Sequence, residues 1–215
     1  MDLKIIYEDE QLLVCYKPAG VATQTKRLGQ QDMESLLKNN RASKGEPSYI
    51  GVVHRLDQPV EGVMVFAKTK EAASDMSRQV QMKEADKFYY AVTDGVPVEK
   101  TGSLEDYLLR DGRTNTSKVV KEGTAGAKKA RLSYEVLAED GTHAILKIQL
   151  DTGRHHQIRV QLAHAGYPIV GDRKYNANSS ATLGDHLKLC SYKIGFVHPK
   201  THKKMEFEIE NPYAC

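Results

Sequence analysis

Val53-His54-Arg55-Leu56-Asp57-Gln58 lies between two short apolar runs, residues 50–53 and 62–68. Runs this apolar are typical of strands that are buried on both faces of a sheet. The polar stretch between them is therefore expected at a strand end or in a loop on a rigid scaffold, where functional residues tend to lie. Arg55 and Asp57 are two positions apart, so they project to the same side of an extended segment. The residues alone leave two interpretations open: a functional carboxylate, or an arginine–carboxylate pair that only stabilises the loop.

Outward from this stretch, the hydrophobic pattern predicts mostly strands. They are expected at residues 4–7, 12–16, 87–92, 130–137, 144–150, 187–196 and 204–209. Helices are expected from an N-cap at Thr69 to about Met82, over residues 154–165, and briefly near residues 33–38. Strands outnumber helices without strict β-α-β alternation, which indicates an α+β fold with a mixed or antiparallel sheet. No repeat or low-complexity linker divides the chain, so residues 1–215 are expected to form one domain.

Composition limits the function only weakly. The chain has 31 Lys and Arg against 28 Asp and Glu, a net charge of +3 that allows a nucleic-acid partner without requiring one. The three cysteines form no C-x-x-C pair, so neither a zinc site nor a disulfide framework is indicated. No apolar run approaches the roughly 20 residues of a membrane span, and no signal peptide opens the chain. A cytoplasmic, soluble protein is expected.

A second polar stretch is Thr152-Gly153-Arg154-His155-His156-Gln157-Ile158-Arg159, at the start of a predicted helix. Helix N-termini favour anions, and several donors crowd this one, so a site for phosphate or carboxylate is predicted. His155 and Arg159 are one helical turn apart and share a face. No H-E-x-x-H pattern and no carboxylate within the helix accompany the histidines, so no metal is expected.

A third stretch is Lys87-Phe88-Tyr89-Tyr90-Ala91, which reads as a strand. The strand period sends the two tyrosines to opposite faces. One is expected in the core, and the other in a cleft where it can stack on a nucleic-acid base, an interaction worth roughly 1–3 kcal/mol.

Residues 110–131 have an unusual composition. They hold seven basic residues against Asp111 and Glu122, and they are rich in Gly, Ser and Thr. Two interpretations stay open for this segment: a mobile, solvated connection, or a basic flap that contacts phosphates.

Taken in order, the three stretches resemble the active-site motifs of the RluA-type pseudouridine synthases. The resemblance extends to the turn Lys17-Pro18-Ala19-Gly20, to residues 166–172 and to His198-Pro199, and so covers nearly the whole chain. It implies the pseudouridine synthase fold, a mostly antiparallel sheet flanked by helices with a central RNA-binding cleft. It also implies an isomerisation of uridine to pseudouridine in ribosomal or transfer RNA, without cofactor or metal.

The resemblance assigns a role to five residues. Asp57 matches the catalytic aspartate, with its action as nucleophile on the sugar or as base at C2′ left open. Arg55 matches an arginine that enters the RNA and supports the flipped-out base, whose extrusion costs a few kcal/mol. Tyr89 matches a tyrosine that stacks on the uracil, and Ile158 an apolar wall of the pocket. Arg159 matches the basic partner of the aspartate, and a guanidinium there favours the carboxylate form.

The chain departs from the family pattern at a few positions. Val60-Glu61 stands where Thr-Ser is usual, His155 where Thr is usual, and Gln161 where His is usual. Glu61 adds a negative charge near the expected site, which is a reason to expect altered RNA preference. The Lys17 turn comes too early for a preceding S4 RNA-binding domain, so target choice is expected to rest on the catalytic domain and the basic segment 110–131.

Two other functions are compatible with parts of the pattern. A non-catalytic RNA-binding protein or chaperone would retain the scaffold and account for the departures. A glycosidase would use Asp57 and Glu61 as its paired carboxylates. If the chain is a pseudouridine synthase, it is expected to be a monomer.

Overall fold

The computed structural model describes residues 3–25, 29–177 and 186–214. The chain forms two compact units: Met1–Lys87 with Ser191–Glu210, and Phe88–Cys190 with Asn211–Cys215. The first two passages between the units lie inside strands, β5 (Asp86–Asp94) and β10 (Leu189–Val197), and the third follows Glu210. The expectation of a single domain stays a prediction.

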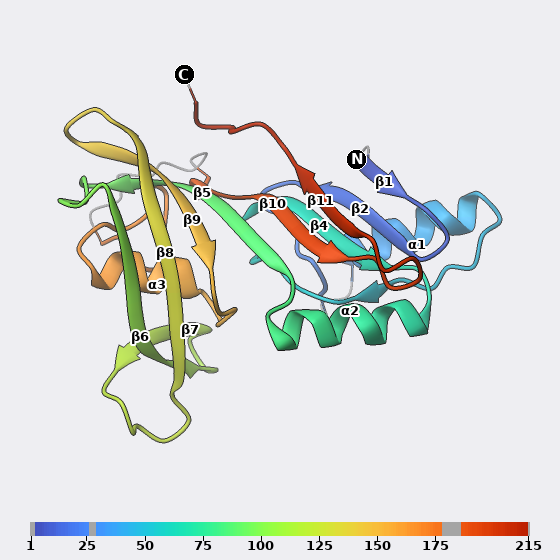
Figure 1. Ribbon diagram of the computed structural model, residues 1–215, viewed down its shortest axis with the longest axis horizontal. Helices are drawn as coiled ribbons and strands as arrows, with labels where there is room; N and C mark the ends of the chain where they lie inside the picture. The colour runs from blue at the N-terminus through green and yellow to red at the C-terminus, as the bar shows by residue number, and fades with distance from the viewer. Residues whose placement is uncertain (1–2, 26–28, 178–185, 215) are drawn as a thin grey trace. The chain divides into compact units, whose positions relative to one another are not determined.

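The first unit is a sheet with two helices. Its strands have the order β1-β2-β4-β10, with β3 paired to β4 and β11 paired to β10 (Figure 1). The elements are β1 (Ile5–Glu8), β2 (Leu12–Lys17), α1 (Met33–Ser43), β3 (Gly51–Val52), β4 (Glu61–Ala67), α2 (Lys70–Met82) and β11 (Lys204–Glu208). The apolar runs of β2 and β4 pair antiparallel, from Leu12 opposite Ala67 to Lys17 opposite Gly62.

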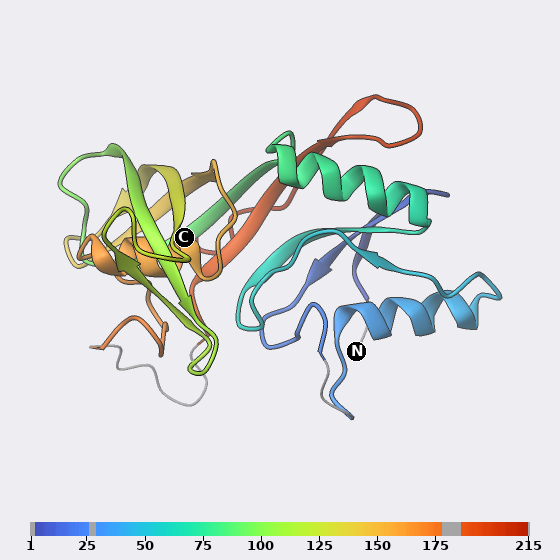
Figure 2. The same cartoon turned by 90° about the horizontal axis from the view of Figure 1, so that it is seen from below.

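Both faces of this sheet are covered. Helix α2 contributes Ala72 and Met76 to a core cluster with alternate residues of β2 and β4, such as Val14 and Val65. Figure 2 shows α1 on the opposite side of these strands from α2. Thr69 caps α2 as predicted, because its hydroxyl accepts a hydrogen bond from the Ala72 amide.

Helix α1 is longer than the short helix predicted near residues 33–38. Its N-cap is Asp32, whose carboxylate accepts from the Ser35 amide. Met33, Leu37 and Arg41 lie on its buried side. The cap and the four-residue spacing of these side chains extend the helix through a stretch that is otherwise polar.

The second unit is an antiparallel sheet of order β5-β9-β8-β6-β7, with one helix. Its further elements are β6 (Thr101–Asp111), β7 (Thr116–Val120), β8 (Lys128–Glu139), β9 (His143–Leu150) and α3 (Gln157–His164). Helix α3 packs through Val160 against Leu108 of β6 and Ala130 of β8.

Two expectations for this unit need correction. Half of residues 110–131 belong to strands β6, β7 and β8, so the interpretation of the whole segment as a loose connection is wrong. Strands β6 and β7 escaped prediction because β6 carries many polar residues on an exposed face, whereas β8 was predicted over residues 130–137. Helix α3 begins at Gln157 and not at Arg154, because His156 adopts the left-handed conformation with φ of 54°.

No helix in the described part of the chain is both long and apolar enough to span a membrane.

Candidate active site

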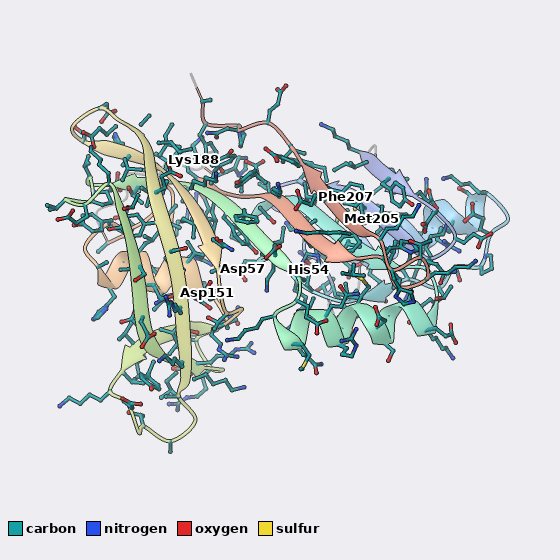
Figure 3. The ribbon with its side chains drawn as sticks, viewed as in Figure 1. His54, Asp57, Asp151, Lys188, Met205 and Phe207 are labelled. Carbon is teal, nitrogen blue, oxygen red and sulfur yellow. The ribbon has the colours of Figure 1, made fainter. Side chains whose placement is uncertain are left out.

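The first polar stretch forms the loop between β3 and β4, residues 53–60, and His54 fastens it to the sheet. The Nε2 atom of His54 accepts a hydrogen bond of 3.1 Å from the amide of Val65 in β4. Burial lowers the pKa of His54 to about 3, and the charge of Lys87 acts in the same direction. The ring is therefore neutral at physiological pH, as an accepting nitrogen requires. Figure 3 shows His54 and Asp57 on their ribbon.

The loop is fastened a second time through Leu56. The buried hydroxyl of Thr23 donates to the Leu56 carbonyl at 2.9 Å and accepts from the Leu56 amide at 3.2 Å. The Thr23 hydroxyl thus pairs with both backbone groups of Leu56, as the backbone of a neighbouring strand would. A turn follows, closed by the Val60 amide on the Asp57 carbonyl at 3.0 Å. Asp57 is half-buried between these fixed points.

Lys17 holds the loop from a third side. Its fully buried ammonium donates to the carbonyls of Pro18, Val21 and Gln58, at 3.1, 2.6 and 3.1 Å. Burial lowers the pKa of Lys17 to about 8, opposed by the charges of Asp57 and then Glu61. The candidate carboxylate thus has a buried cation nearby. Sequence reasoning treated Lys17 only as part of a turn, although a lysine ending an apolar strand was an available signal.

Glu61 and Gly62 begin β4 directly after the loop. The Tyr16 hydroxyl donates to the Glu61 carboxylate at 2.6 Å, so this departure from the family pattern has a local partner. Gly62 has φ of 127°, and a Cβ atom there would lie 2.1 Å from the Ser191 carbonyl oxygen. Only glycine fits this approach of β4 and β10.

Arg55 is exposed, and it makes no ion pair or side-chain hydrogen bond with any residue in the described ranges. The local pair between Arg55 and Asp57 that the sequence left open is therefore not formed. The guanidinium is presented to solvent on a loop that is otherwise firmly held.

In the second unit, Arg159 is buried in α3 with a carboxylate of the same unit. Its Nε and Nη2 atoms donate to the two oxygens of Asp172, both at 2.7 Å. Its guanidinium lies 5.1 Å from the ring centre of Tyr175. Sequence reasoning missed Asp172, which lay within a family landmark without an assigned role. The pairing of Arg159 with Asp57 stays a prediction.

Tyr89 and Ile158 are both buried residues of the second unit. Along β5 the more buried positions are Tyr89, Ala91 and Thr93, whereas Phe88 and Tyr90 alternate with them. The two tyrosines therefore face opposite ways, as the strand period predicts. The predicted site residues are thus divided, with Arg55 and Asp57 in the first unit and Tyr89, Ile158 and Arg159 in the second.

Gln161, which stands in α3 where the family usually has histidine, has structural partners. Its Nε2 atom donates to the Asp106 carboxylate at 2.8 Å, and its Oε1 accepts from Gln157 at 3.0 Å. Within the described ranges, no group of three or more His, Cys, Asp or Glu side chains is arranged to hold a metal ion.

Comparison with known proteins identifies the family. Residues 11–164 match the family described as RNA pseudouridylate synthase. An uncharacterised RNA pseudouridine synthase of Aquifex aeolicus is 35% identical over 98% of this chain and 70% of its own length. The ribosomal large subunit pseudouridine synthase D of Pseudomonas aeruginosa is 34% identical over 99% of this chain and 69% of its own length.

A solved structure shares the fold. The human RNA pseudouridylate synthase domain containing 4 superposes with a TM-score of 0.82 at 23% identity, covering 98% of this chain and 89% of that one. The α+β pseudouridine synthase fold predicted from the three motifs is confirmed, and so is the RluA-type resemblance.

Proposed function

The chain belongs to the RNA pseudouridylate synthase family and is an RNA pseudouridine synthase, an isomerase; from that premise we propose that it acts on specific uridines of structured RNA with Asp57 as its essential carboxylate. The observation that carries the assignment to Asp57 is the triple fastening of its loop by His54, Thr23 and Lys17. A carboxylate acts efficiently only when its position is fixed relative to the reacting atoms.

The proposed reaction conserves every atom of the nucleoside except one exchangeable hydrogen. The N1–C1′ bond of uridine breaks, the uracil turns, and a C5–C1′ bond forms, while the C5 hydrogen leaves to solvent as a proton and N1 takes up a proton. Asp57 acts in its ionised form, either at C1′ as nucleophile or at C2′ as base. The charge of Asp57 in turn raises the pKa of the buried Lys17 ammonium, against the lowering by burial.

Four further residues are proposed to bind the RNA. Arg55 is exposed on the Asp57 loop and free to enter the RNA, where it supports the extruded base. Tyr89 stacks on the uracil, Ile158 forms an apolar wall of the pocket, and Arg159 supplies positive charge. The last three roles rest on the family resemblance.

Ribosomal RNA is the first target to test, because the Pseudomonas aeruginosa relative is named for the ribosomal large subunit. Transfer RNA is the second. Mapping pseudouridines in cellular RNA with and without the gene identifies the uridine directly.

The test of Asp57 uses RNA tritiated at C5 of its uridines. The wild-type chain is expected to release tritium, whereas Asp57→Asn should reduce the rate by about 10²-fold or more, as loss of an acid–base or nucleophilic group does. Asp140→Asn, at an exposed position of the second unit, is the matched control and should release tritium at the wild-type rate. Full release by Asp57→Ala would overturn the role of this carboxylate, and no release from any cellular RNA would overturn the function.

A further inference from the structure

The turn between β6 and β7 gathers basic side chains around one neutral residue. The side-chain oxygen of Asn115 accepts from Arg110 Nη2 at 3.3 Å and contacts His155 Nε2 at 3.2 Å. The main-chain oxygen of Asn115 accepts from Lys174 Nζ at 2.7 Å. These four residues, Arg110, Asn115, His155 and Lys174, are called the Asn115 cluster. They come from β6, the turn, the segment before α3 and the segment after it, all within the second unit.

The two permanent cations of the cluster are Arg110 and Lys174. In the described part of the chain, no carboxylate lies within ion-pair distance of Arg110 or Lys174, and both are exposed. The nearby Asp111 carboxylate is engaged by the Arg113 amide at 2.9 Å and interacts with Lys118. Arg110 and Lys174 therefore converge on two oxygens of one neutral residue, which accept a hydrogen bond from each but carry no negative charge.

Two other basic residues of this unit, Lys129 and Arg131, are already paired with carboxylates. Lys129 pairs with Glu105 at 2.7 Å, and Arg131 pairs with Asp151 at 3.1 Å. The excess positive charge of residues 110–131 is thus unevenly distributed, and part of it lies near the turn between β6 and β7.

The turn is held rigidly enough to act as a site. His155 stacks on His156 with ring centres 3.7 Å apart, and its Nδ1 lies 2.9 Å from the Ser117 hydroxyl. The Tyr175 hydroxyl joins the two segments, because it contacts His156 Nδ1 at 2.7 Å and accepts from the Ser117 amide at 2.8 Å. These contacts fix the position of the turn relative to the start of α3.

We propose that the Asn115 cluster binds a backbone phosphodiester of the RNA substrate. The proposal rests on the proposed function and adds to it a contact that orients the RNA without reading its sequence. A phosphodiester offers two non-bridging oxygens and one negative charge, which matches two exposed cations without a carboxylate partner. It also gives His155 a role, at a position where the family usually has a threonine.

The test measures binding of a fluorescein-labelled stem–loop RNA, with one uridine in its loop, over a series of salt concentrations. Each phosphate contact contributes to the slope of log K against log salt, so Lys174→Met and Arg110→Met should each reduce that slope by about one. Affinity should fall similarly for stem–loops of different sequence. Lys174→Arg keeps the charge and should keep the slope.

Lys100→Met is the matched control. It removes one positive charge from an exposed lysine of the same unit, but Lys100 is already paired with Glu139. Its slope should equal that of the wild type. Inorganic phosphate at constant ionic strength should not displace the RNA; displacement would assign the cluster to free phosphate and overturn the proposal.

The remaining outcomes separate this inference from the proposed function. An unchanged slope in both methionine variants, or no RNA binding by the wild type at the lowest salt, overturns the phosphate site. Tritium release that persists alongside an unchanged slope leaves the enzymatic function standing. A reduced slope without tritium release supports the site and counts against the function.

Discussion

Lys17 places an ammonium group in the interior of the first unit, next to the loop of Asp57. Three carbonyls replace its water, yet burial still lowers its pKa to about 8. His54 on the same loop has its pKa lowered to about 3 and stays neutral. One titratable group near Asp57 is therefore charged and the other neutral at physiological pH, and both are fixed by hydrogen bonds to the backbone.

The charge of Lys17 has a measurable effect on stability. Between its folded pKa of about 8 and the ordinary value of 10.5, the unfolded chain binds more protons at this site. The free energy of unfolding therefore rises with pH across that window, by up to about 3 kcal/mol from this group. Cys15 opposes the rise above pH 9, because burial raises its pKa to about 12.

Comparing the wild type with Lys17→Met isolates the contribution of Lys17 to the pH dependence of stability, because the other groups titrate in both proteins. Urea unfolding from pH 7 to pH 10.5 should show the stability of the wild type increasing relative to the variant. A difference that stays constant with pH would contradict the assignment.

At the scale of the element, β4 depends on the absence of a side chain at Gly62. A methyl group there would lie 2.1 Å from the carbonyl oxygen of Ser191 in β10, and the backbone must shift to admit it. We expect Gly62→Ala to lower the free energy of unfolding by about 3 kcal/mol or more. Because Gly62 follows the Asp57 loop, tritium release should fall as well.

Gly112→Ala is the control for that substitution. Gly112 has open space where a Cβ atom would lie and no positive φ, so its change should stay within about 0.5 kcal/mol. Equal stabilities of the two variants in thermal or urea unfolding would show that the close approach of β4 and β10 at Gly62 tolerates a methyl group.

The elements that could be predicted from sequence are those with a local signal. The apolar runs of β2 and β4 and the Thr69 cap of α2 are of this kind. Strands β6 and β7 were missed because their polar, partly exposed residues lack the hydrophobic alternation of a buried strand. Asp57 was found through its motif. Lys17 and Thr23 were missed because they reach the loop across 41 and 33 residues, which local patterns do not encode.

At the scale of the whole molecule, two of the three crossings between the units lie inside strands, β5 and β10. Strands that continue from one unit to the other are expected to couple their unfolding. Met76→Ala removes a fully buried side chain from the first unit and should cost about 2–5 kcal/mol.

Native-state hydrogen exchange measures whether that loss is shared. Amides of β6 and β8 in the second unit should lose protection together with those of β2 and β4. Protection lost in the first unit alone would show that the units unfold separately and would contradict the prediction of a single domain over residues 1–215.

The division of the first unit between Met1–Lys87 and Ser191–Glu210 has a consequence for how the protein is made. A ribosome delivers β2, β4 and the Asp57 loop early, but the partner strand β10 only after residues 88–188 of the second unit. The core around Val14 and Val65 lacks Ile194 and Phe196 until then. We expect the nascent chain to fold its second unit first, and to complete the setting of Asp57 near the end of translation.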